Sequence, residues 1–194
     1  MRKPSFLKKL TITGVFMLGL VTVAQADPAN LALTGTATQS STHNWSIPLG
    51  ASNAVDGNTS GNIYTGSVTH TAEQYQPWWQ VDLLGTFDLD QIVLWNRTDA
   101  CSYRLSNFNV SVLDNLYNTV WTNDFFADGG YPTSSLTIDL PDNTLGQIVK
   151  VRLNGSEYLS LAEVQVFAAP EPGSMLLLGF GLLGLVGLRR RLKK

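Results

Sequence analysis

The segment Trp78-Trp79-Gln80-Val81-Asp82-Leu83 sets a pattern that recurs through the middle of this 194-residue chain. Apolar residues occupy every second position from Trp79 to Leu83, which is the spacing of a strand with one buried face. Adjacent strand side chains point to opposite faces, so one of the two tryptophans should lie in the core and the other at the rim. Further segments of five to seven residues are alternating or rich in β-branched residues: Asp90–Trp95, Asn107–Leu113, Ser135–Leu140, Ile148–Leu153 and Ala162–Phe167.

Turn-forming residues separate these segments and complete the prediction of an all-β fold. They are Gly85, Asp128-Gly129-Gly130, Pro141-Asp142-Asn143 and Asn154-Gly155. No amphipathic helix longer than a turn or two is indicated away from the ends. Many short strands with turn signals predict a jelly-roll β-sandwich. The segment Asn30–Gly66 is rich in Ser, Thr, Asn and Gly, and predicts loops around one or two short strands, where binding residues usually lie.

The charge distribution excludes nucleic acid as a partner. Between Asp27 and Ala169 there are only four Lys or Arg residues against fourteen Asp and Glu, a formal charge of −10. Phosphate binding requires a basic face, which this segment lacks. The single cysteine, Cys101, excludes an internal disulfide, and its expected place is a small buried position.

The N-terminus reads as a secretory signal peptide, residues 1–26. A basic start precedes the apolar run Leu10–Val23 and the small-x-small sequence Ala24-Gln25-Ala26, typical of a cleavage site. An uncleaved membrane anchor is the alternative. The predicted domain then occupies residues 27–169.

The C-terminal segment, residues 170–194, contains Pro170-Glu171-Pro172, the apolar run Met175–Leu188 and a terminal basic cluster. This order resembles the PEP-CTERM sorting signal of Gram-negative bacteria. The resemblance implies export across the inner membrane, transient membrane anchoring, processing by an exosortase-type protease, and delivery to the cell envelope or the extracellular matrix. A plain anchor is the alternative, although the run of fourteen residues is shorter than the usual span of about 20.

Two of the four cations of residues 27–169, Arg97 and Arg104, lie seven residues apart around Asp99, with His70 upstream. A guanidinium presents several donors in a fixed fork, which suits a pair of adjacent hydroxyls on a sugar. An imidazole can donate from one nitrogen and be oriented through the other. Asp99 could hold an arginine by a charge-assisted pair. The alternative is that both arginines form structural ion pairs, with Asp99 and a neighbour.

The spacing Arg97-x-Asp99-x-x-x-x-Arg104 with His70 upstream resembles the fucose-binding motif of the F-type lectins, or fucolectins, which are discoidin-like, galactose-binding-like β-sandwiches. The likeness runs over nearly all of Asn30–Phe167 and includes Ala37-Thr-Gln-Ser-Ser41, Ala54-Val-Asp-Gly-Asn-Thr59, Ser67-Val-Thr-His-Thr71, Pro77-Trp-Trp-Gln-Val-Asp-Leu83 and Leu161-Ala-Glu-Val164.

The resemblance implies a carbohydrate-binding site in which His70, Arg97 and Arg104 bind the sugar hydroxyls. Tyr64 and Trp45 are then expected to cover the apolar side of the ring. Family members often carry two adjacent cysteines where this chain has Ala100-Cys101. The departure changes the apolar platform and leaves the polar contacts possible. His43, in a Ser/Thr-rich loop, is expected to be exposed.

A calcium site is the second expectation from the resemblance. Asp56-Gly57-Asn58 could bring oxygen ligands together, but by itself it is equally an ordinary turn. The resemblance implies a structural Ca²⁺ held by five residues that all carry suitable oxygens here: Asn53, Asp56, Asn58, Ser67 and Glu163.

Three function classes follow. The leading one is a secreted lectin for fucose or a similar sugar, for which an oligomer or repeated display would add avidity. An enzyme such as a glycosidase is disfavoured, because the acids are scattered and no nucleophile elbow or complete metal triad appears. A non-catalytic envelope or matrix scaffold that has lost sugar binding is the remaining alternative.

Overall fold

The computed structural model describes residues 28–170 except Gly66, and beyond them only Gly179 and Gly181. The predicted signal peptide, residues 1–26, and nearly all of the predicted sorting segment, residues 170–194, lie outside the described residues. Within the described part of the chain, no helix is long and apolar enough to cross a membrane.

Two long antiparallel strands, β3 (Trp78–Asn96) and β6 (Ser135–Leu153), run the length of the domain and pair with each other. Each has 19 residues and joins two of the predicted strands into one. The predicted turns at Gly85 and at Pro141-Asp142-Asn143 are therefore wrong. At these points the pairing register shifts and the strands bend without ending, as β-bulges do, so turn residues marked a bend rather than a boundary.

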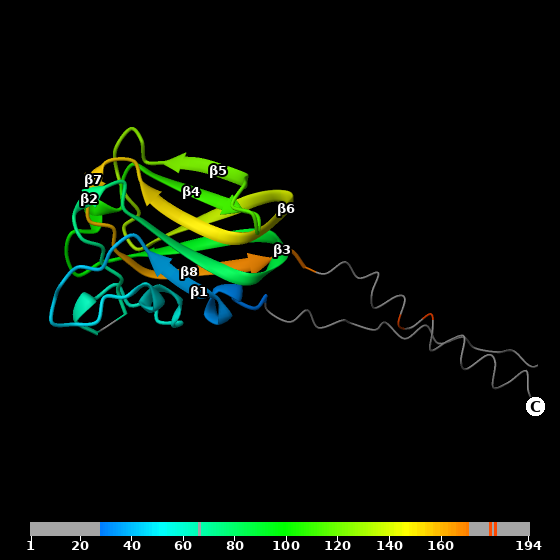
Figure 1. Ribbon diagram of the computed structural model, residues 1–194, viewed down its shortest axis with the longest axis horizontal. Helices are drawn as coiled ribbons and strands as arrows, with labels where there is room; N and C mark the ends of the chain where they lie inside the picture. The colour runs from blue at the N-terminus through cyan, green and yellow to red at the C-terminus, as the bar shows by residue number, and fades with distance from the viewer. Residues whose placement is uncertain (1–27, 66, 171–178, 180, 182–194) are drawn as a thin grey trace, which may run out of the picture.

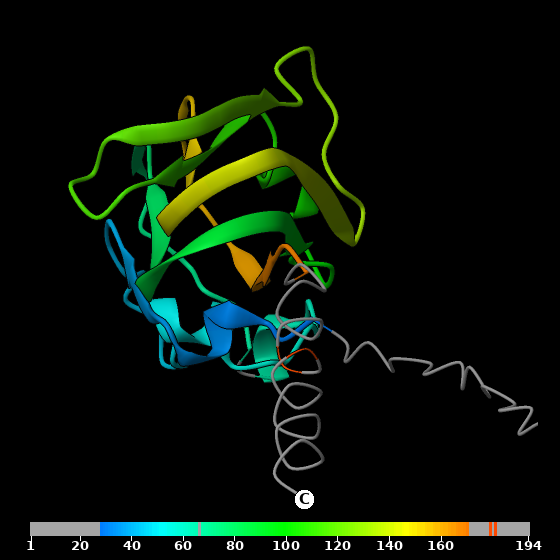
Figure 2. The same cartoon turned by 90° about the vertical axis from the view of Figure 1, so that its right-hand side faces the viewer.

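The bend lets the same two strands take part in both layers of a sandwich (Figure 1). In the first layer, β3 lies between β1 (Thr36–Gln39) and β6, followed by β4 (Phe108–Leu113) and β5 (Thr119–Phe125). Figure 2 shows β6 between β3 and β4. In the second layer, the later half of β3 lies between the start of β6 and β8 (Leu161–Ala168), where Ile92 pairs with both Ile138 and Val166. The predicted all-β, jelly-roll sandwich is confirmed.

Alternating residues of the long strands fill the space between the layers. Trp79 and Val81 of β3 and Val149 of β6 are completely buried. The Trp79 indole Nε1 donates a hydrogen bond to the Ala51 carbonyl at 2.9 Å, so its one polar group is satisfied. Trp78, one residue earlier, is only half-buried. The predicted division of the two tryptophans between core and rim is confirmed.

Several short elements were not indicated by the sequence pattern. They are β5, β2 (Gln74–Tyr75) and β7 (Ser156–Glu157), together with the 3-10 helices η1 (Leu31–Thr34), η2 (Ala51–Val55), η3 (Ile63–Thr65) and η4 (Ser102–Arg104). Strand β5 was missed because most of its side chains are exposed and its alternation is weak. The predicted loops around a short strand in Asn30–Gly66 are confirmed, with β1 as that strand.

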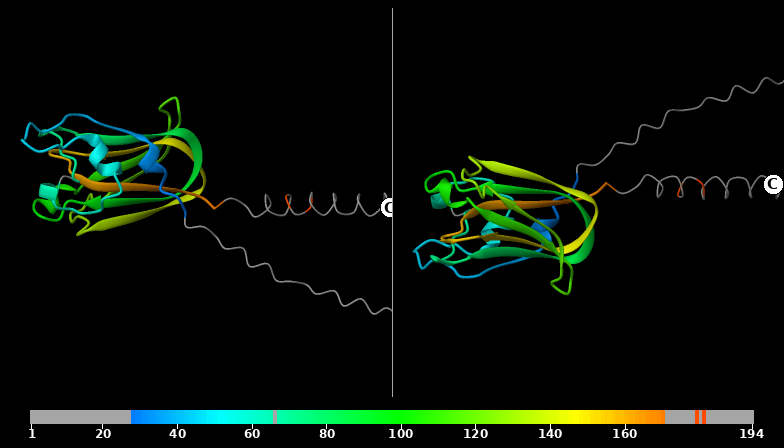
Figure 3. Two further views of the ribbon diagram at one scale, coloured as in Figure 1. Left: turned by 90° about the horizontal axis from the view of Figure 1, so that it is seen from below. Right: turned by 90° about the horizontal axis from the view of Figure 1, so that it is seen from above.

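The two ends of the sandwich have different roles. Asn30 pairs with Phe167, so the described chain enters and leaves at the same end. The small two-stranded β2–β7 sheet and the loops around it lie at the other end (Figures 1 and 3). Anything attached through the termini is therefore held away from these loops.

Candidate functional site

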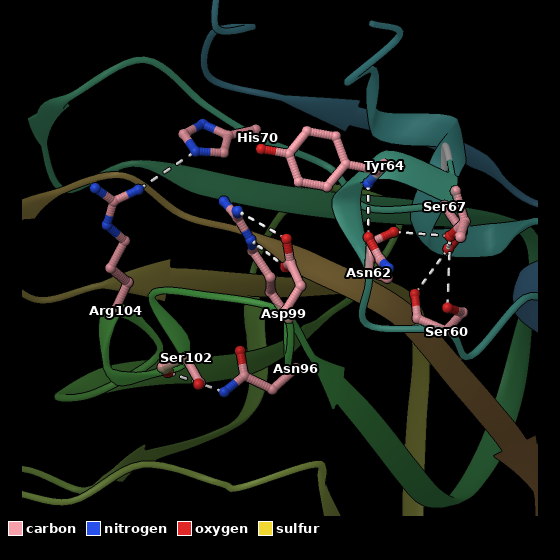
Figure 4. A network of polar contacts seen from close by, with 11 residues as sticks. Ser60, Asn62, Tyr64, Ser67, His70, Asn96, Asp99, Ser102 and Arg104 are labelled. Carbon is pink, nitrogen blue, oxygen red and sulfur yellow. Dashed lines mark hydrogen bonds and ion pairs between the residues drawn. The ribbon is translucent and has the colours of Figure 1, made fainter.

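Arg97 and Arg104 lie at the loop end of the sandwich, in the connection that follows β3. Asn96, the last residue of β3, is 2% exposed, and its side-chain amide donates to the carbonyls of Ser102 at 2.9 Å and Pro132 at 2.7 Å. Asn96 thus fixes the start of η4, which carries Arg104. Figure 4 shows this contact below the charged side chains. The sequence analysis did not single out Asn96, because its role depends on Pro132, far along the chain.

Arg97 is fixed by Asp99 in a bidentate pair. Its Nε donates to Asp99 Oδ1 at 2.7 Å and its Nη2 donates to Oδ2 at 3.2 Å. The exposed fractions of the two side chains are 7% and 13%. Partial burial alone would raise the pKa of Asp99, but the hydrogen bond and the charge of Arg97 outweigh it and lower that pKa below its ordinary value. The pair leaves Nη1 of Arg97 for another acceptor.

Arg104 contacts three groups from other parts of the chain. Its Nη1 lies 3.4 Å from Nε2 of His70, its Nε lies 3.3 Å from Oε1 of Glu157, and its guanidinium lies 4.4 Å above the ring of Tyr158. The contact with Glu157 is an ion pair without hydrogen-bond geometry, since Nε has no hydrogen-bond partner within the described residues. Both arginines therefore form the structural ion pairs that were the alternative interpretation of the sequence, Arg97 with Asp99 and Arg104 with Glu157.

His70 is 4% exposed and is held in one orientation. Its Nδ1 lies 2.8 Å from the Thr71 carbonyl oxygen, which can only accept, so Nδ1 carries the proton and Nε2 of the neutral ring has a free lone pair. Burial is the main cause of a lowered pKa of His70, and the nearby His43, Arg104 and Arg97 lower it further against the Thr71 bond. Nε2 of His70 is therefore an acceptor that faces the Nη1 donor of Arg104.

His43 contradicts its prediction as an exposed loop residue. It is partly buried, its backbone N–H donates to the His70 carbonyl at 2.9 Å, and its ring lies edge-on to that of His70 with centroids 5.0 Å apart. Tyr158, which also was not predicted, has its ring centroid 5.2 Å from that of His70 and 5.7 Å from that of His43, so the three rings form one cluster. No sequence signal near either residue indicated these contacts, because both come from distant loops.

The two predicted aromatic residues, Tyr64 and Trp45, lie beside each other at the same end of the molecule. Their ring centroids are 6.2 Å apart, and their exposed fractions are 72% and 43%. Trp45 is also 6.0 Å from His43, which connects the aromatic pair to His70. In Figure 4 the Tyr64 ring lies between His70 and the loop of Ser67. Large aromatic side chains left exposed beside polar groups are suited to covering a ligand's apolar face.

Cys101 is half-buried, not buried as expected, and is a free thiol. It adopts a left-handed backbone conformation with φ of 56° immediately before η4. Such a conformation is uncommon for residues other than Gly and Asn, and it turns the chain from the Arg97 loop into η4. Its neighbour Ala100 is exposed.

The five predicted calcium ligands come from η2 (Asn53), from the segment that follows it (Asp56, Asn58 and Ser67) and from β8 (Glu163). Oε1 of Glu163 accepts from the Gly57 amide at 3.2 Å, between Asp56 and Asn58. Asn53 Nδ2 donates to the Val68 carbonyl at 3.3 Å, and Ser67 Oγ donates to the Ser60 carbonyl at 2.7 Å.

Among these five residues, Glu163 gives the clearest indication of a cation site. It is completely buried, and its Oε2 has no hydrogen-bond partner within the described residues. Burial raises its pKa to about 7; the Asp56 charge adds to the increase and the Gly57 amide opposes it. A buried carboxylate oxygen without a donor is costly unless a cation coordinates it, so the donor set fits Ca²⁺.

The loop of residues 56–67 and the Arg97 loop are in close contact. The Gly61 carbonyl accepts from the Thr98 amide at 2.9 Å. A Cβ atom at position 61 would lie 2.7 Å from the Asn96 carbonyl oxygen, so only glycine allows this approach. Any ion that orders the 56–67 loop would therefore also support the loop that carries Arg97.

Comparisons with known proteins match the chain in two places. Residues 53–151 match the family described as NedA-like, galactose-binding domain, and residues 168–191 match the PEP-CTERM protein-sorting motif. The chain is 36% identical over 141 residues to a fucolectin of Anguilla anguilla, covering 71% of this chain and 89% of the relative.

Solved structures share the fold at similar identity. A fucose binding module of Streptococcus pneumoniae, SpX-3, has 37% identity and a TM-score of 0.67, covering 73% of this chain and 98% of the module. The lectin domain of lectinolysin, solved with Lewis B antigen, has 35% identity and a TM-score of 0.66, covering 74% of this chain and 99% of that domain. These relatives are lectins and a sugar-binding module, and the prediction of a non-catalytic protein is confirmed.

Proposed function

This chain belongs to the fucolectin, or F-type lectin, family of NedA-like galactose-binding domains, and from that premise we propose that it binds fucose or a similar sugar through His70, Arg97 and Arg104. The observation that carries the proposal is the arrangement of His70 Nε2 and Arg104 Nη1, 3.4 Å apart. One nitrogen accepts and the other donates, so a single sugar hydroxyl lying against both can donate to the first and accept from the second.

The remaining polar contacts follow from the two fixed guanidinium groups. Arg97 is held by Asp99, and Arg104 is held against Tyr158 and Glu157. Arginines that are fixed before the ligand arrives lose little conformational freedom on binding, which favours affinity. Two guanidinium groups can donate to neighbouring hydroxyls of one ring, whereas a lone lysine would provide a single point charge.

The exposed rings of Tyr64 and Trp45 support contact with the apolar face of the same sugar. Fucose lacks a hydroxyl at its methyl end, so one side of the ring is apolar and gains from aromatic contact. This pair would supply the platform that the adjacent cysteines supply in many family members, where this chain has Ala100-Cys101.

We further propose that a structural Ca²⁺ is held by oxygens of Asn53, Asp56, Asn58, Ser67 and Glu163. The unpartnered Oε2 of Glu163 supports this site. The ion would neutralise Asp56 and Glu163 and fix the loop that leads to Tyr64. It would take no direct part in contacting the sugar.

The proposed setting is the exterior of a Gram-negative cell. The chain carries a PEP-CTERM sorting motif over residues 168–191, which supports export, transient membrane anchoring and processing by an exosortase-type protease. The described chain enters and leaves the sandwich opposite the sugar loops, so a tether would leave the site facing outward (Figure 3).

A glycan array tests the proposal directly. The solved S. pneumoniae module corresponds to the sandwich over 98% of its own length, so residues 27–169 should fold without the ends. We expect binding to fucosylated glycans, Lewis b among them, with calcium present and weaker binding in EDTA. Absence of binding to every fucosylated and galactosylated glycan would contradict the lectin and favour the scaffold alternative.

Sugar binding is also expected to depend on pH through His70. Its acceptor atom is Nε2 of the neutral ring, and its pKa lies below the ordinary value of 6.5 because of burial and the facing His43, Arg104 and Arg97. Tyr158, Glu157 and Glu73 flank the same space. Affinity should be constant above the ordinary pKa, persist somewhat below it, and fall once the pH passes the lowered value.

The stability of the folded domain is expected to change with pH in the same direction as the sugar affinity. Between the lowered pKa and the ordinary one the unfolded chain binds more protons at this position, so the His70 contribution is complete above the ordinary value and declines as pH falls. Titration of fucose binding by calorimetry from neutral to acidic pH measures the effect. His70→Gln, whose side chain does not titrate, should flatten the profile; an unchanged profile would assign the pH dependence to another group.

A further inference from the structure

The two cations outside the proposed sugar site, Lys150 and Arg152, lie together on the outward face of the first layer. They are two residues apart in β6 and therefore leave the sheet on the same face, while Val149 and Val151 point into the core. All four cations of residues 27–169 are thus gathered in two pairs. In a segment with a formal charge of −10, a pair of cations without ion-pair partners needs an explanation.

Neither cation forms an ion pair with an acid within the described part of the chain. The ion pairs there join Arg97 to Asp99 and Arg104 to Glu157. Nε of Arg152 is buried and has no hydrogen-bond partner among the described residues. A buried donor on a charged group that lacks an acceptor is unfavourable, so the positive charge of Arg152 is poorly compensated inside the domain.

Asp124 is near Arg152 but is already engaged. Its Oδ1 accepts from the side-chain amides of Asn109 at 2.9 Å and Asn154 at 3.2 Å. These two hydrogen bonds are the main reasons that the pKa of Asp124 is lowered, and the Arg152 charge contributes less. Asp124 therefore borders the pair of cations without pairing with either one.

Lys150 is held over an aromatic ring. Its Nζ lies 4.8 Å from the ring centroid of the half-buried Trp78. Burial, and then the neighbouring Arg152 charge, lower the pKa of Lys150. An anion placed against both cations would offset each of these unfavourable effects.

The surrounding side chains are those of a sugar-binding surface. The pairing register sets Lys150 between Gln80 and Ser111, and sets Arg152 between Trp78 and Asn109. We call these six residues the Lys150 face. They combine one aromatic ring with amide and hydroxyl groups around two cations spaced about 7 Å apart along the strand.

We propose that the Lys150 face binds the carboxylate groups of an acidic polysaccharide lying across the sheet. The proposal is independent of the fucose site, because it uses neither the loop end nor its residues. A polymer that presents carboxylates among hydroxyl groups is complementary to two cations among hydroxyl-binding groups. A nucleic acid carries far denser charge, and the −10 segment would repel it while only two cations attract it.

Binding of a hyaluronan oligosaccharide to residues 27–169 at low salt tests the proposal. The double variant Lys150→Met with Arg152→Met keeps both aliphatic stems over the sheet and removes both charges. We expect the affinity of this double variant for the oligosaccharide to be lower by at least roughly tenfold. Oligosaccharide whose carboxyl groups are reduced to alcohols should not bind the unaltered domain, and added salt should weaken binding.

A matched variant controls for net charge. Ser135→Asp with Thr137→Asp changes the charge by the same amount on exposed positions of the second layer, and should bind hyaluronan like the unaltered domain. Saturating fucose and the Arg104→Ala substitution should leave hyaluronan binding unchanged, whatever the outcome at the fucose site. Equal loss in both double variants, competition by fucose, or equally tight binding of single-stranded DNA would each overturn the proposal.

Discussion

Arg104→Ala is expected to lower the affinity for fucose by at least about a hundredfold and to leave the domain folded. The guanidinium group supplies the donor opposite His70 Nε2 and lies over Tyr158. Its removal leaves Glu157 without its cation and leaves the sugar hydroxyl without a donor. Calorimetric titration with free fucose and a thermal melt of the same sample measure the two effects.

The control for this substitution is Arg152→Met, which removes a cation from the same domain outside the loop end. It should bind neutral fucose like the unaltered protein, since Arg152 lies on the first layer and has no contact with His70, Arg97 or Arg104 among the described residues. Arg104→Lys should recover little, because an ammonium group lacks the planar face and the fork of donors. Normal fucose binding by Arg104→Ala would show that the sugar binds at another place on the domain.

The fold class could be predicted because it depends on local alternation, which tertiary structure does not alter. Trp79 and Val81 are buried where the pattern places them. The division into strands could not be read in the same way. Gly85 and Pro141-Asp142-Asn143 are turn residues in isolation, yet pairing between β3 and β6 continues across them and turns them into bends. Whether such residues end a strand is decided by the partner strand.

The candidate site divides along similar lines. Arg97, Asp99 and Arg104 are close in sequence, so their association could be expected from spacing. Arg97 and Asp99 indeed form a bidentate pair. Glu157 and Tyr158 come from the segment around β7 and His43 from the loop after β1, and their contacts exist only after these segments meet at one end of the sandwich. Spacing predicts the residues of one loop, whereas packing supplies the rest.

Removal of calcium is expected to lower the melting temperature of the domain by roughly 10 °C, and to weaken fucose binding. The buried Glu163 carboxylate has an oxygen without a donor, and the charge of Asp56 is close enough to raise its pKa. Without a cation, the negative charges of Asp56 and Glu163 repel each other and destabilise the folded loop. Because the 56–67 loop contacts the Thr98 amide through Gly61, loosening it should also displace Arg97. Melts with calcium and with EDTA measure the change.

Glu163→Gln separates the ion from the rest of the loop. The amide oxygen can still accept from the Gly57 N–H, while the charge that would coordinate Ca²⁺ is gone. Its melting temperature should therefore no longer respond to EDTA. Asp128→Asn, at an exposed acid in a distant turn, should respond like the unaltered domain. If EDTA leaves the unaltered domain unchanged, no calcium stabilises this loop; if it lowers Glu163→Gln equally, the ion is bound by other residues.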